Sequence, residues 1–206
     1  ASEANYRGLI DNMLEGVYQT RPDGTFISAN PALIRLLGFS SEKELMAVGN
    51  ARDLYIRTEE RHISVDKLDR NGIVRNSELG LRRKDGKEII VLENARIVRD
   101  EKGNVSHYEG VLTDITERKR AEKIQNVLFN ISQATNSTKN LEELLVNIHK
   151  ELSTLIDTTN FYIALYDEKT DLYSFPYTVD EFEEGESFSP QQLKKSLTDY
   201  VRKTGK

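Results

Sequence analysis

The sequence predicts an α+β fold: a five-stranded antiparallel sheet with helices on one side, then a connecting helix and a partial α/β domain. Short apolar and β-branched segments bounded by turn residues indicate the strands. Helical patterns gather between the second and third strands instead of alternating with every strand, which is typical of an α+β domain. The last strand, at about 105–116, leads into a charged helix with no Gly or Pro between them.

The first elements are a helix and a hairpin. Residues 4–13 carry apolar side chains at helical spacing. Strands at 16–20 and 26–28 flank Asp23-Gly24, a pair that favours tight hairpin turns. This arrangement predicts one edge of the sheet.

Several helices follow the hairpin. In the segment 30–38 an Asn-Pro pair opens a helix and a Gly closes it. Ser41 and Glu44 have capping-box spacing and indicate another short helix. A further helix is expected at 58–70, where an Asn-Gly pair stops it.

Three longer strands complete the first domain, at about 73–83, 87–98 and 105–116. The first two are joined by Lys84-Asp85-Gly86-Lys87, whose Asp-Gly pair favours the turns that match strand twist. We place this domain at residues 1–116.

Residues 117–137 form the predicted connecting helix. Its apolar residues repeat at intervals of three and four, which makes one narrow seam. Two interpretations stay open: a parallel coiled coil between two chains, or an amphipathic helix packed on its own domain. The seam consists of Ala121, Ile124, Leu128 and Ile131, with Val127 beside it.

The remaining residues, 138–206, carry few elements. An apolar helix starts near Leu141, strands are expected at 161–166 and 172–175, and a capped helix at about 189–202 closes the chain. So few elements make a thin core. We therefore expect a second domain that is cut short.

Composition excludes several classes of function. The net charge of −5 gives no general basic field for nucleic acid or anionic membranes. No stretch approaches the roughly 20 apolar residues that span a bilayer, and no signal peptide is visible, so we expect a cytoplasmic protein. The chain has no Cys, which excludes thiol nucleophiles, Cys-ligated metals and thioether-linked chromophores.

A set of short motifs carries a family resemblance in the first domain. In their order and spacing, they make the first 120 residues resemble a PAS sensory domain. The motifs are Asp23-Gly24, Asn30-Pro31-Ala32, Leu37-Gly38-Phe39-Ser40, Glu44-Leu45, Arg82-Arg83-Lys84-Asp85-Gly86, and Gly110 to Thr116 followed by Glu117-Arg118-Lys119-Arg120.

From about residue 126 onward the chain resembles the first half of a GAF domain, on segments 148–152, 160–167, 174–177 and 197–201. The two resemblances imply the input region of a larger bacterial or archaeal signalling protein, such as a sensor histidine kinase or a cyclic-dinucleotide enzyme. They also imply that any kinase or cyclase activity lies outside this chain.

The PAS resemblance implies a role for the junction between the last strand and the helix. The side chains of Asp114 and Thr116 can bond there to sheet residues or to amides at the helix start. We predict that Asp114 pairs with a basic residue of the same domain and that both residues couple the sheet to the helix. The alternative is a helix cap with no signalling content.

A small-molecule pocket is predicted between the sheet and the helices at 30–47 and 51–70. The alternative is that the same side chains simply fill the core. The ligand is unknown. The PAS resemblance implies that flavin, bilin and coumaryl chromophores could be attached covalently, but each of these attachments needs a Cys, so all three are excluded. The candidate lining residues are Ile34, Leu37, Leu54, Ile63, Leu79 and Val91.

The chain has three histidines, each a potential ligand or acceptor group. His62 lies near the position of the haem ligand in haem-binding PAS domains, but its spacing to the helix end differs, so haem is not expected. His107 is expected on the sheet surface. His149 opens a segment similar to a histidine-kinase phosphoacceptor box, without the acid after the histidine or the following Pro. A half-buried structural histidine is the expectation, and a phosphoacceptor is the alternative.

The sequence therefore predicts a sensory or signal-relay region with no catalytic residues of its own and no metal site. Its expected partners are a second copy of the chain through the connecting helix, a downstream output domain and a small-molecule ligand. A constitutive dimerisation scaffold is the remaining alternative.

Overall fold

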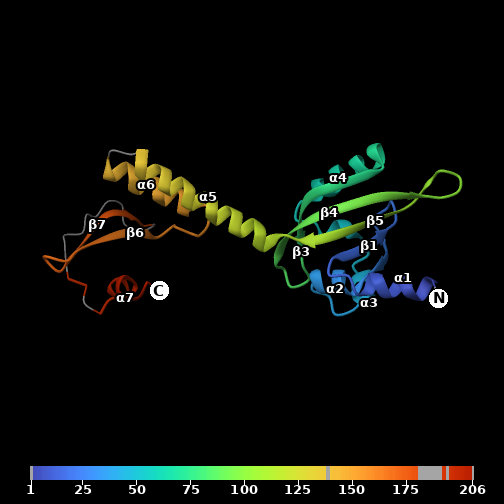
Figure 1. Ribbon diagram of the computed structural model, residues 1–206, viewed down its shortest axis with the longest axis horizontal. Helices are drawn as coiled ribbons and strands as arrows, with labels where there is room; N and C mark the ends of the chain where they lie inside the picture. The colour runs from blue at the N-terminus through green and yellow to red at the C-terminus, as the bar shows by residue number, and fades with distance from the viewer. Residues whose placement is uncertain (1, 138–139, 181–191, 194, 206) are drawn as a thin grey trace. The chain divides into compact units, whose positions relative to one another are not determined.

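The structure, a computed structural model of the 206-residue chain, describes residues 2–137, 140–180, 192–193 and 195–205. The chain divides into two compact units, Ala1–Arg120 and Ala121–Lys206. The elements of each unit are labelled in Figure 1.

The first unit is built on one five-stranded antiparallel sheet, as the sequence predicted. The strands are arranged in the order β2-β1-β5-β4-β3, so that β5 lies in the centre beside both β1 and β4. Their bounds are β1 (Gly16–Thr20), β2 (Phe26–Ala29), β3 (Ile73–Arg82), β4 (Glu88–Arg99) and β5 (Val105–Asp114).

Four helical segments stand between β2 and β3. Asn30 caps the first of them by accepting a hydrogen bond from the Leu33 amide, and Pro31 occupies its first turn, as the sequence predicted. The short 3₁₀ turn η1 was not predicted. The segments are α2 (Pro31–Leu36), α3 (Glu42–Met46), η1 (Ala51–Leu54) and α4 (Thr58–Asn71).

The hydrophobic core lies between these helices and the inner face of the sheet. Leu33, Leu37 and Leu45 from the helical side and Leu81 and Val91 from the strands are each at most 3% exposed. The core therefore joins α2 and α3 to β3 and β4, and it encloses the site described below.

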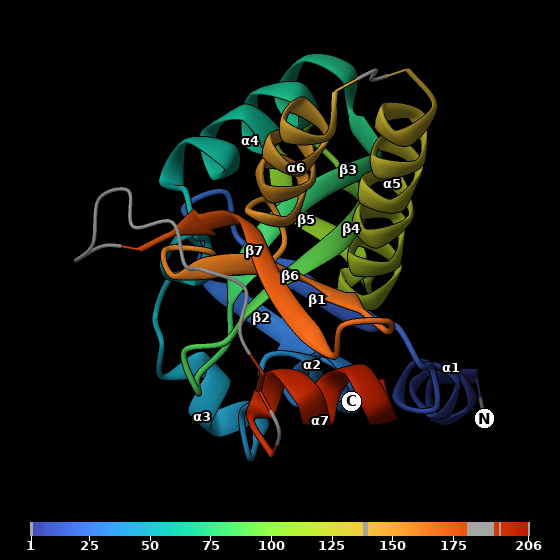
Figure 2. The same cartoon turned by 90° about the vertical axis from the view of Figure 1, so that its left-hand side faces the viewer.

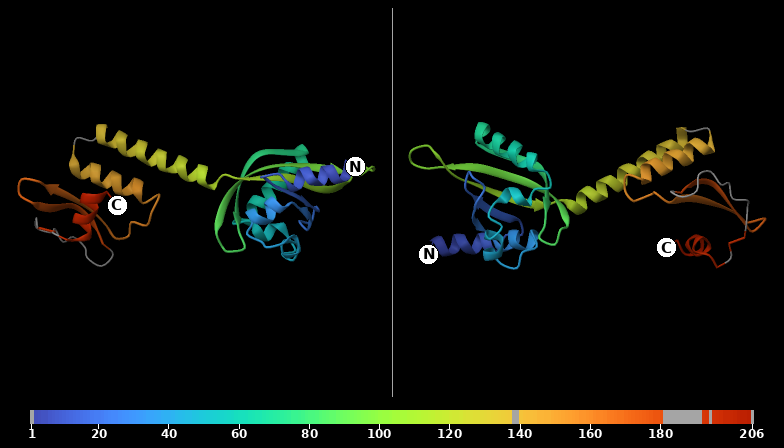
Figure 3. Two further views of the ribbon diagram at one scale, coloured as in Figure 1. Left: turned by 60° about the horizontal axis from the view of Figure 1, so that its bottom comes forward. Right: turned by 180° about the vertical axis from the view of Figure 1, so that it is seen from behind.

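The N-terminal helix α1 (Ser2–Asp11), marked by N in Figure 3, departs from the prediction that all helices lie on one side of the sheet. Ile10 at its end and the nearby Met13 line a groove of about 450 Å³ with Val17 and Val111 of the outer sheet face. Helix α1 thus reaches the face opposite to the core.

The connecting helix α5 (Thr116–Ser137) begins one residue after β5 ends at Asp114. The intervening residue, Ile115, is 5% exposed, and the amide of Lys119 already donates to its carbonyl. The passage from strand to helix is therefore continuous, as the sequence predicted. The boundary between the two units falls inside α5, after Arg120.

The second unit contains α6 (Leu141–Leu152), the antiparallel strands β6 (Phe161–Asp167) and β7 (Leu172–Val179), and α7 (Leu197–Thr204). Helix α6 lies beside the second half of α5 (Figures 1 and 2), where Asn130 Nδ2 donates to Glu151 Oε2 at 2.9 Å. Residues 189–191 and 194 of the predicted last helix lie outside the described residues, and the described helix starts at Leu197. No described helix is long and apolar enough to cross a bilayer.

Candidate functional site

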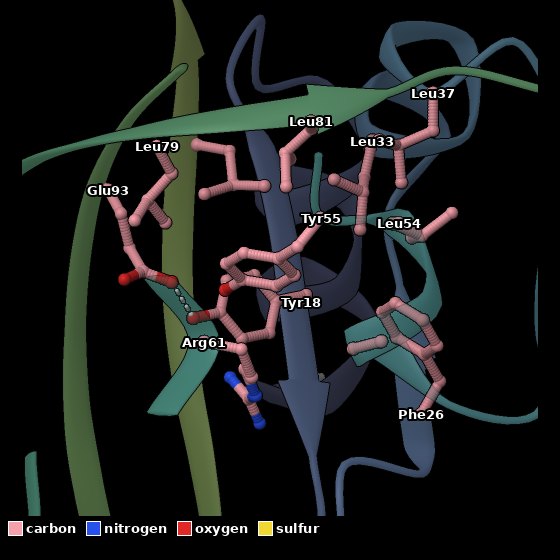
Figure 4. A pocket seen from close by; sticks show the side chains of 12 residues that line it. Tyr18, Phe26, Leu33, Leu37, Leu54, Tyr55, Arg61, Leu79, Leu81 and Glu93 are labelled. Carbon is pink, nitrogen blue, oxygen red and sulfur yellow. Dashed lines mark hydrogen bonds between the residues drawn. The ribbon is translucent and has the colours of Figure 1, made fainter. Parts of the chain in front are cut away.

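A small cavity of about 30 Å³ lies inside the first unit, between the sheet and the helices (Figure 4). This space has room for about one or two water molecules. Most of its wall is apolar, but one part is polar and carries both a carboxylate and a guanidinium. The lining residues are Tyr18, Phe26, Leu33, Leu37, Ala51, Leu54, Tyr55, Arg61, Leu79, Leu81, Glu93 and Leu112.

Helix α4 places two polar side chains, Arg61 and Ser64, in the interior of the first unit. Its buried residues are Arg61, Ser64 and Leu68, spaced by three and four residues so that they share one face of the helix. Two of these three are polar, so the inward face of α4 looks like a surface face in the sequence. This is why the helix brings hydrogen-bonding groups into an otherwise apolar core.

Glu93 is the centre of the polar part. It is 1% exposed on β4, where Tyr18 Oη donates to its Oε1 at 2.7 Å and Ser64 Oγ donates to its Oε2 at 2.7 Å (Figure 4 draws the first bond). No cation of the described residues forms an ion pair with Glu93. The buried carboxylate is therefore held by two neutral hydroxyls.

The position of Tyr18 depends on a glycine in the neighbouring strand. Tyr18 of β1 pairs with Gly110 of β5, and a Cβ at Gly110 would lie 2.6 Å from Tyr18 Oη. Only the absence of a side chain at Gly110 lets the Tyr18 ring lie over β5 and reach Glu93. This glycine is required for space, since its φ is not in the left-handed region.

The two tyrosines of the cavity stay protonated. Burial raises the pKa of Tyr18 well above its usual value, and the Glu93 carboxylate adds to the rise. Burial and Glu93 likewise raise the pKa of Tyr55, whereas the Arg61 guanidinium beside it lowers that pKa. Both side chains therefore present O–H groups to the cavity.

Three buried side-chain atoms of this unit have no hydrogen-bond partner among the described residues: Thr20 Oγ1, Arg61 Nη2 and Arg83 Nε. Arg61 is 6% exposed and its Nη2 is unpaired among the described residues, and Thr20 is fully buried with an unpaired Oγ1. Buried donors normally find a partner, because an unpaired one loses its bonds to water without replacement. Arg61 is the most telling of the three, since it lines the cavity and carries a charge.

The structure divides the six predicted pocket residues. Leu37, Leu54 and Leu79 line the cavity. Val91 is fully buried in the same core without lining the cavity, and Ile34 packs against that core. The prediction that Ile63 lines the pocket was wrong. Ile63 is 54% exposed, because Arg61 and Ser64 occupy the inward positions of α4.

The predicted coupling residues meet at the start of α5. Asp114 Oδ1 accepts hydrogen bonds from the amide of Thr116 at 2.9 Å and from its hydroxyl at 2.6 Å. The predicted basic partner of Asp114 is not found among the described residues. Asp114 is exposed at the last position of β5 and accepts from the first residue of the helix, so its carboxylate is satisfied locally.

Thr116 ties the helix start to β4. The amide of Ile90 donates to Thr116 Oγ1 at 3.0 Å, and the amide of Ile115 donates to the Ile90 carbonyl at 2.9 Å. One turn later, Lys119 Nζ lies 2.6 Å from Glu78 Oε1 of β3. The first turn of α5 is thus bonded to two strands of the sheet.

The histidines lie away from the cavity. His62 is exposed on α4, and His107 lies beside Glu109 on the sheet, 3.8 Å from its Oε2. In the second unit, His149 Nδ1 lies 2.9 Å from Tyr177 Oη and its Nε2 lies 3.0 Å from Thr158 Oγ1. Both ring nitrogens of His149 are therefore engaged, as in a structural histidine.

Large cofactors do not fit the cavity as it stands. Pockets for drug-sized ligands measure roughly 300–1,000 Å³, at least ten times the 30 Å³ found here. Haem iron also needs an axial ligand such as His, and none of the lining residues is a His. Neither a flavin nor a haem matches this lining.

The polar part of the site was not predicted from the sequence: it consists of Tyr18, Tyr55, Arg61, Ser64 and Glu93. One signal was available for Glu93. Strand residues two apart face the same side of a sheet, and Glu93 follows the inward positions of Ile89 and Val91 in β4. An acid in that register was a sign of a buried carboxylate.

Comparison with known proteins identifies the first unit. The family model described as a PAS domain matches residues 14–117, about half of the chain. The chain therefore belongs to the PAS domain family, and membership indicates a sensory signalling role. A search of curated proteins found no match.

One solved structure with a TM-score above 0.5 supports the fold, and a second shows a weaker likeness. The PAS domain of a protein from Colwellia psychrerythraea is 18% identical with a TM-score of 0.51, over 57% of this chain and 99% of that chain. A domain of a sensory box sensor histidine kinase/response regulator from Geobacter sulfurreducens is 18% identical with a TM-score of 0.46, over 55% and 94%.

An RNA-binding light-oxygen-voltage receptor is 24% identical with a TM-score of 0.49, over 56% of this chain and 34% of that chain. The chain thus spans about a third of the length of that receptor.

Proposed function

We propose that this chain is the sensory and relay region of a multidomain cytoplasmic signalling protein. The PAS unit senses a small molecule or a partner, and α5 carries the change to a downstream output domain. Kinase or cyclase chemistry belongs to domains outside these 206 residues. In this proposal the second unit is the first part of a GAF-like domain.

The observation that carries the proposal is the position of β4 between the cavity and α5. Glu93 of this strand forms the polar wall of the cavity, and Ile90, three residues earlier, bonds through its main chain to Ile115 and Thr116. A sheet strand transmits small displacements along its length because its hydrogen bonds and packing resist local deformation. A change at Glu93 therefore reaches the start of α5 through one strand.

Hydrogen exchange of the full chain tests the relay. Glu93→Gln keeps the shape of the side chain but changes how it meets the hydroxyls of Tyr18 and Ser64. We expect faster exchange at the Lys119 amide, whose bond to the Ile115 carbonyl closes the first turn of α5. If the exchange rates change only around the cavity and the Lys119 amide keeps its rate, the relay proposal is wrong.

A second pair of variants tests the junction itself. Thr116→Val removes the hydroxyl that bonds Asp114 and Ile90, and we expect a loss of about 1 kcal/mol of stability in the first turn of α5. Thr116→Ser retains the hydroxyl and serves as the control. In Thr116→Val, the response of Lys119 to Glu93→Gln should disappear, whereas Thr116→Ser should preserve it.

We also propose a homodimer through α5. Val127 is 4% exposed, whereas Ile124 and Leu128 of the predicted seam are 47% and 60% exposed. Two such seams facing each other would bury these side chains in a short parallel coiled coil.

Light scattering of the full chain measures its molar mass and therefore its oligomeric state. We expect a dimer that dissociates in the double variant Ile124→Glu/Leu128→Glu, because the introduced like charges would face each other. The control Gln125→Glu/Asn126→Asp adds the same number of acids at neighbouring exposed positions and should stay dimeric. A monomeric parent chain at the highest concentration tested would contradict the proposal.

A further inference from the structure

We propose that the cavity of the PAS unit binds a short-chain carboxylic acid as its anion. The carboxylate would pair with Arg61, and the short hydrocarbon body would lie against the leucine and phenylalanine side chains of the wall. This inference rests on the proposed sensory function and names the class of ligand that the cavity takes.

Arg61 supplies the first argument. Its guanidinium stays charged at all ordinary pH values, yet the residue is 6% exposed and its Nη2 has no hydrogen-bond partner among the described residues. None of the described carboxylates forms an ion pair with it. A buried charge without an ion-pair partner is costly, so an anion that enters the cavity gains an interaction with Nη2 that the protein itself leaves unmade.

Glu93 is not the ion-pair partner of Arg61, since its oxygens already accept hydrogen bonds from Tyr18 and Ser64. It also limits the charge that the cavity accepts. A phosphate or a dicarboxylate would bring a second negative charge next to Glu93 with Arg61 as the single cation of the lining. A monoanion with one planar head group matches the guanidinium and is repelled less by Glu93 than a dianion is.

Tyr55 adds a donor for the same head group. Its side chain lines the cavity beside Arg61, and its raised pKa keeps the hydroxyl protonated and able to donate. A carboxylate with two oxygens can accept from the guanidinium and from this hydroxyl together.

The rest of the wall selects an apolar body. Phe26, Leu33, Leu37 and Leu54 offer no hydrogen bonds from their side chains, so a hydroxylated or amino-substituted chain would lose its water without replacement. The volume of about 30 Å³ accommodates a head group, and the body requires that leucine side chains change rotamer. Close packing makes such changes costly, which restricts the ligand to short chains.

Titration of the full ¹⁵N-labelled chain, followed by NMR, tests the assignment with sodium butanoate as the probe. Butanamide is the neutral isostere, sodium chloride controls for ionic strength, and octanoate tests the size limit. We expect saturable shifts at amides around the cavity with butanoate. Butanamide and chloride should cause no such shifts, and octanoate should bind more weakly than butanoate.

Variants assign the binding to Arg61. Arg61→Gln should weaken butanoate at least about tenfold, because a charge-assisted hydrogen bond is lost. Arg61→Lys retains the charge without the planar fork and should be intermediate. Arg70→Gln on the same helix is the control, since the Arg70 side chain is 74% exposed. The dispersion of each spectrum shows that the variant is folded.

The outcomes separate this inference from the proposed function. If butanamide binds as well as butanoate, or if no acid binds to the parent chain, the carboxylate assignment is wrong. In that case a response of the Lys119 amide to Glu93→Gln would still support the relay. If butanoate binds through Arg61 but leaves exchange at Lys119 unchanged, the site stands and the relay is wrong.

Discussion

Two buried carboxylates, one in each unit, are stabilised in different ways. Glu93 of the PAS unit is 1% exposed and accepts from the hydroxyls of Tyr18 and Ser64. Asp199 of the second unit is 5% exposed and accepts from Tyr173 Oη at 2.8 Å. It also accepts from two cations of its own helix, Arg202 and Lys203. One acid thus has neutral partners, and the other has its counter-ions.

The partners also differ in where they come from. Arg202 and Lys203 follow Asp199 by three and four residues, so any α7 helix places them on the same face. The donors to Glu93 lie 75 and 29 residues away and meet it only when β1, α4 and β4 pack together. The Glu93 cluster therefore reports on tertiary structure, whereas the Asp199 cluster is largely local.

This difference fits different tasks. Asp199 fixes α7 to β7 through Tyr173, and Arg202 strengthens the contact by donating to Tyr173 Oη and stacking 4.0 Å over the Tyr166 ring. Glu93 forms no ion pair with a cation of the described residues, so its surroundings respond to any charged or hydrogen-bonding group that enters the cavity. A sensor needs the arrangement around Glu93, and a structural attachment needs the arrangement around Asp199.

The largest expected effect comes from filling the space under Tyr18. In Gly110→Ala the new Cβ would clash with the Tyr18 hydroxyl, at 2.6 Å in the present geometry. The ring must move and its bond to Glu93 is lost, so we expect the PAS unit to lose about 3 kcal/mol of unfolding free energy. Denaturant unfolding of the full chain measures the loss.

Gly8→Ala is the control for this variant. Gly8 lies in α1 with no atom within 4 Å of its virtual Cβ, and Ala favours a helix over Gly. It should leave the PAS unit as stable as the parent or slightly more so. Equal stability of Gly110→Ala and the parent would show that Tyr18 is not held over Gly110.

A pair of Tyr→Phe changes compares the two carboxylates directly. Tyr18→Phe leaves the buried Glu93 with Ser64 as its remaining donor, and we expect a loss of about 2 kcal/mol. Tyr173→Phe removes one of three partners of Asp199, and the two cations remain. We therefore expect a smaller loss in the second unit than in the PAS unit.

Thermal unfolding followed by circular dichroism, with one transition assigned to each unit by limited proteolysis, measures both variants. The comparison fails if Tyr173→Phe destabilises its unit more than Tyr18→Phe destabilises the PAS unit. In that event the cations of α7 would contribute less to Asp199 than the geometry indicates.

Most of the fold was predictable because its signals are local. Asp23-Gly24 and the Asp85-Gly86 pair located two hairpins, and Asn30 with Pro31 located α2, since turns and caps need particular residue types at particular positions. The 3₁₀ turn Ala51–Leu54 was missed because four residues carry no periodic pattern. The Gly-free passage from β5 into α5 was also readable from the sequence.

The polar site was not predictable in the same way. Arg61 and Ser64 can be buried because Tyr55 and Glu93 form hydrogen bonds with them in the folded chain. Partners this far apart in the sequence leave no local signal. Choosing the apolar Ile63 as a lining residue followed the usual rule that apolar residues face inward. The rule fails on α4 because the interior it faces is polar.

The smallest expected effect concerns pH and the cations of Asp199. The hydrogen bond from Lys203, together with those from Tyr173 and Arg202, holds the pKa of Asp199 well below its usual value. A carboxyl group with a lowered pKa in the folded state stabilises the fold above its unfolded pKa of about 4, and this contribution is lost as pH falls through the folded value.

Asp199→Asn removes the contribution, so the stability difference between parent and variant should be largest at neutral pH and shrink below about pH 4. The Lys203 side chain is 58% exposed, and water screens much of its attraction, so the difference should be smaller than that of either tyrosine variant. A difference that stays constant over the whole acid range would mean that Asp199 acts through its shape and hydrogen bonds alone, and the contrast with Glu93 would then rest on geometry and not on charge.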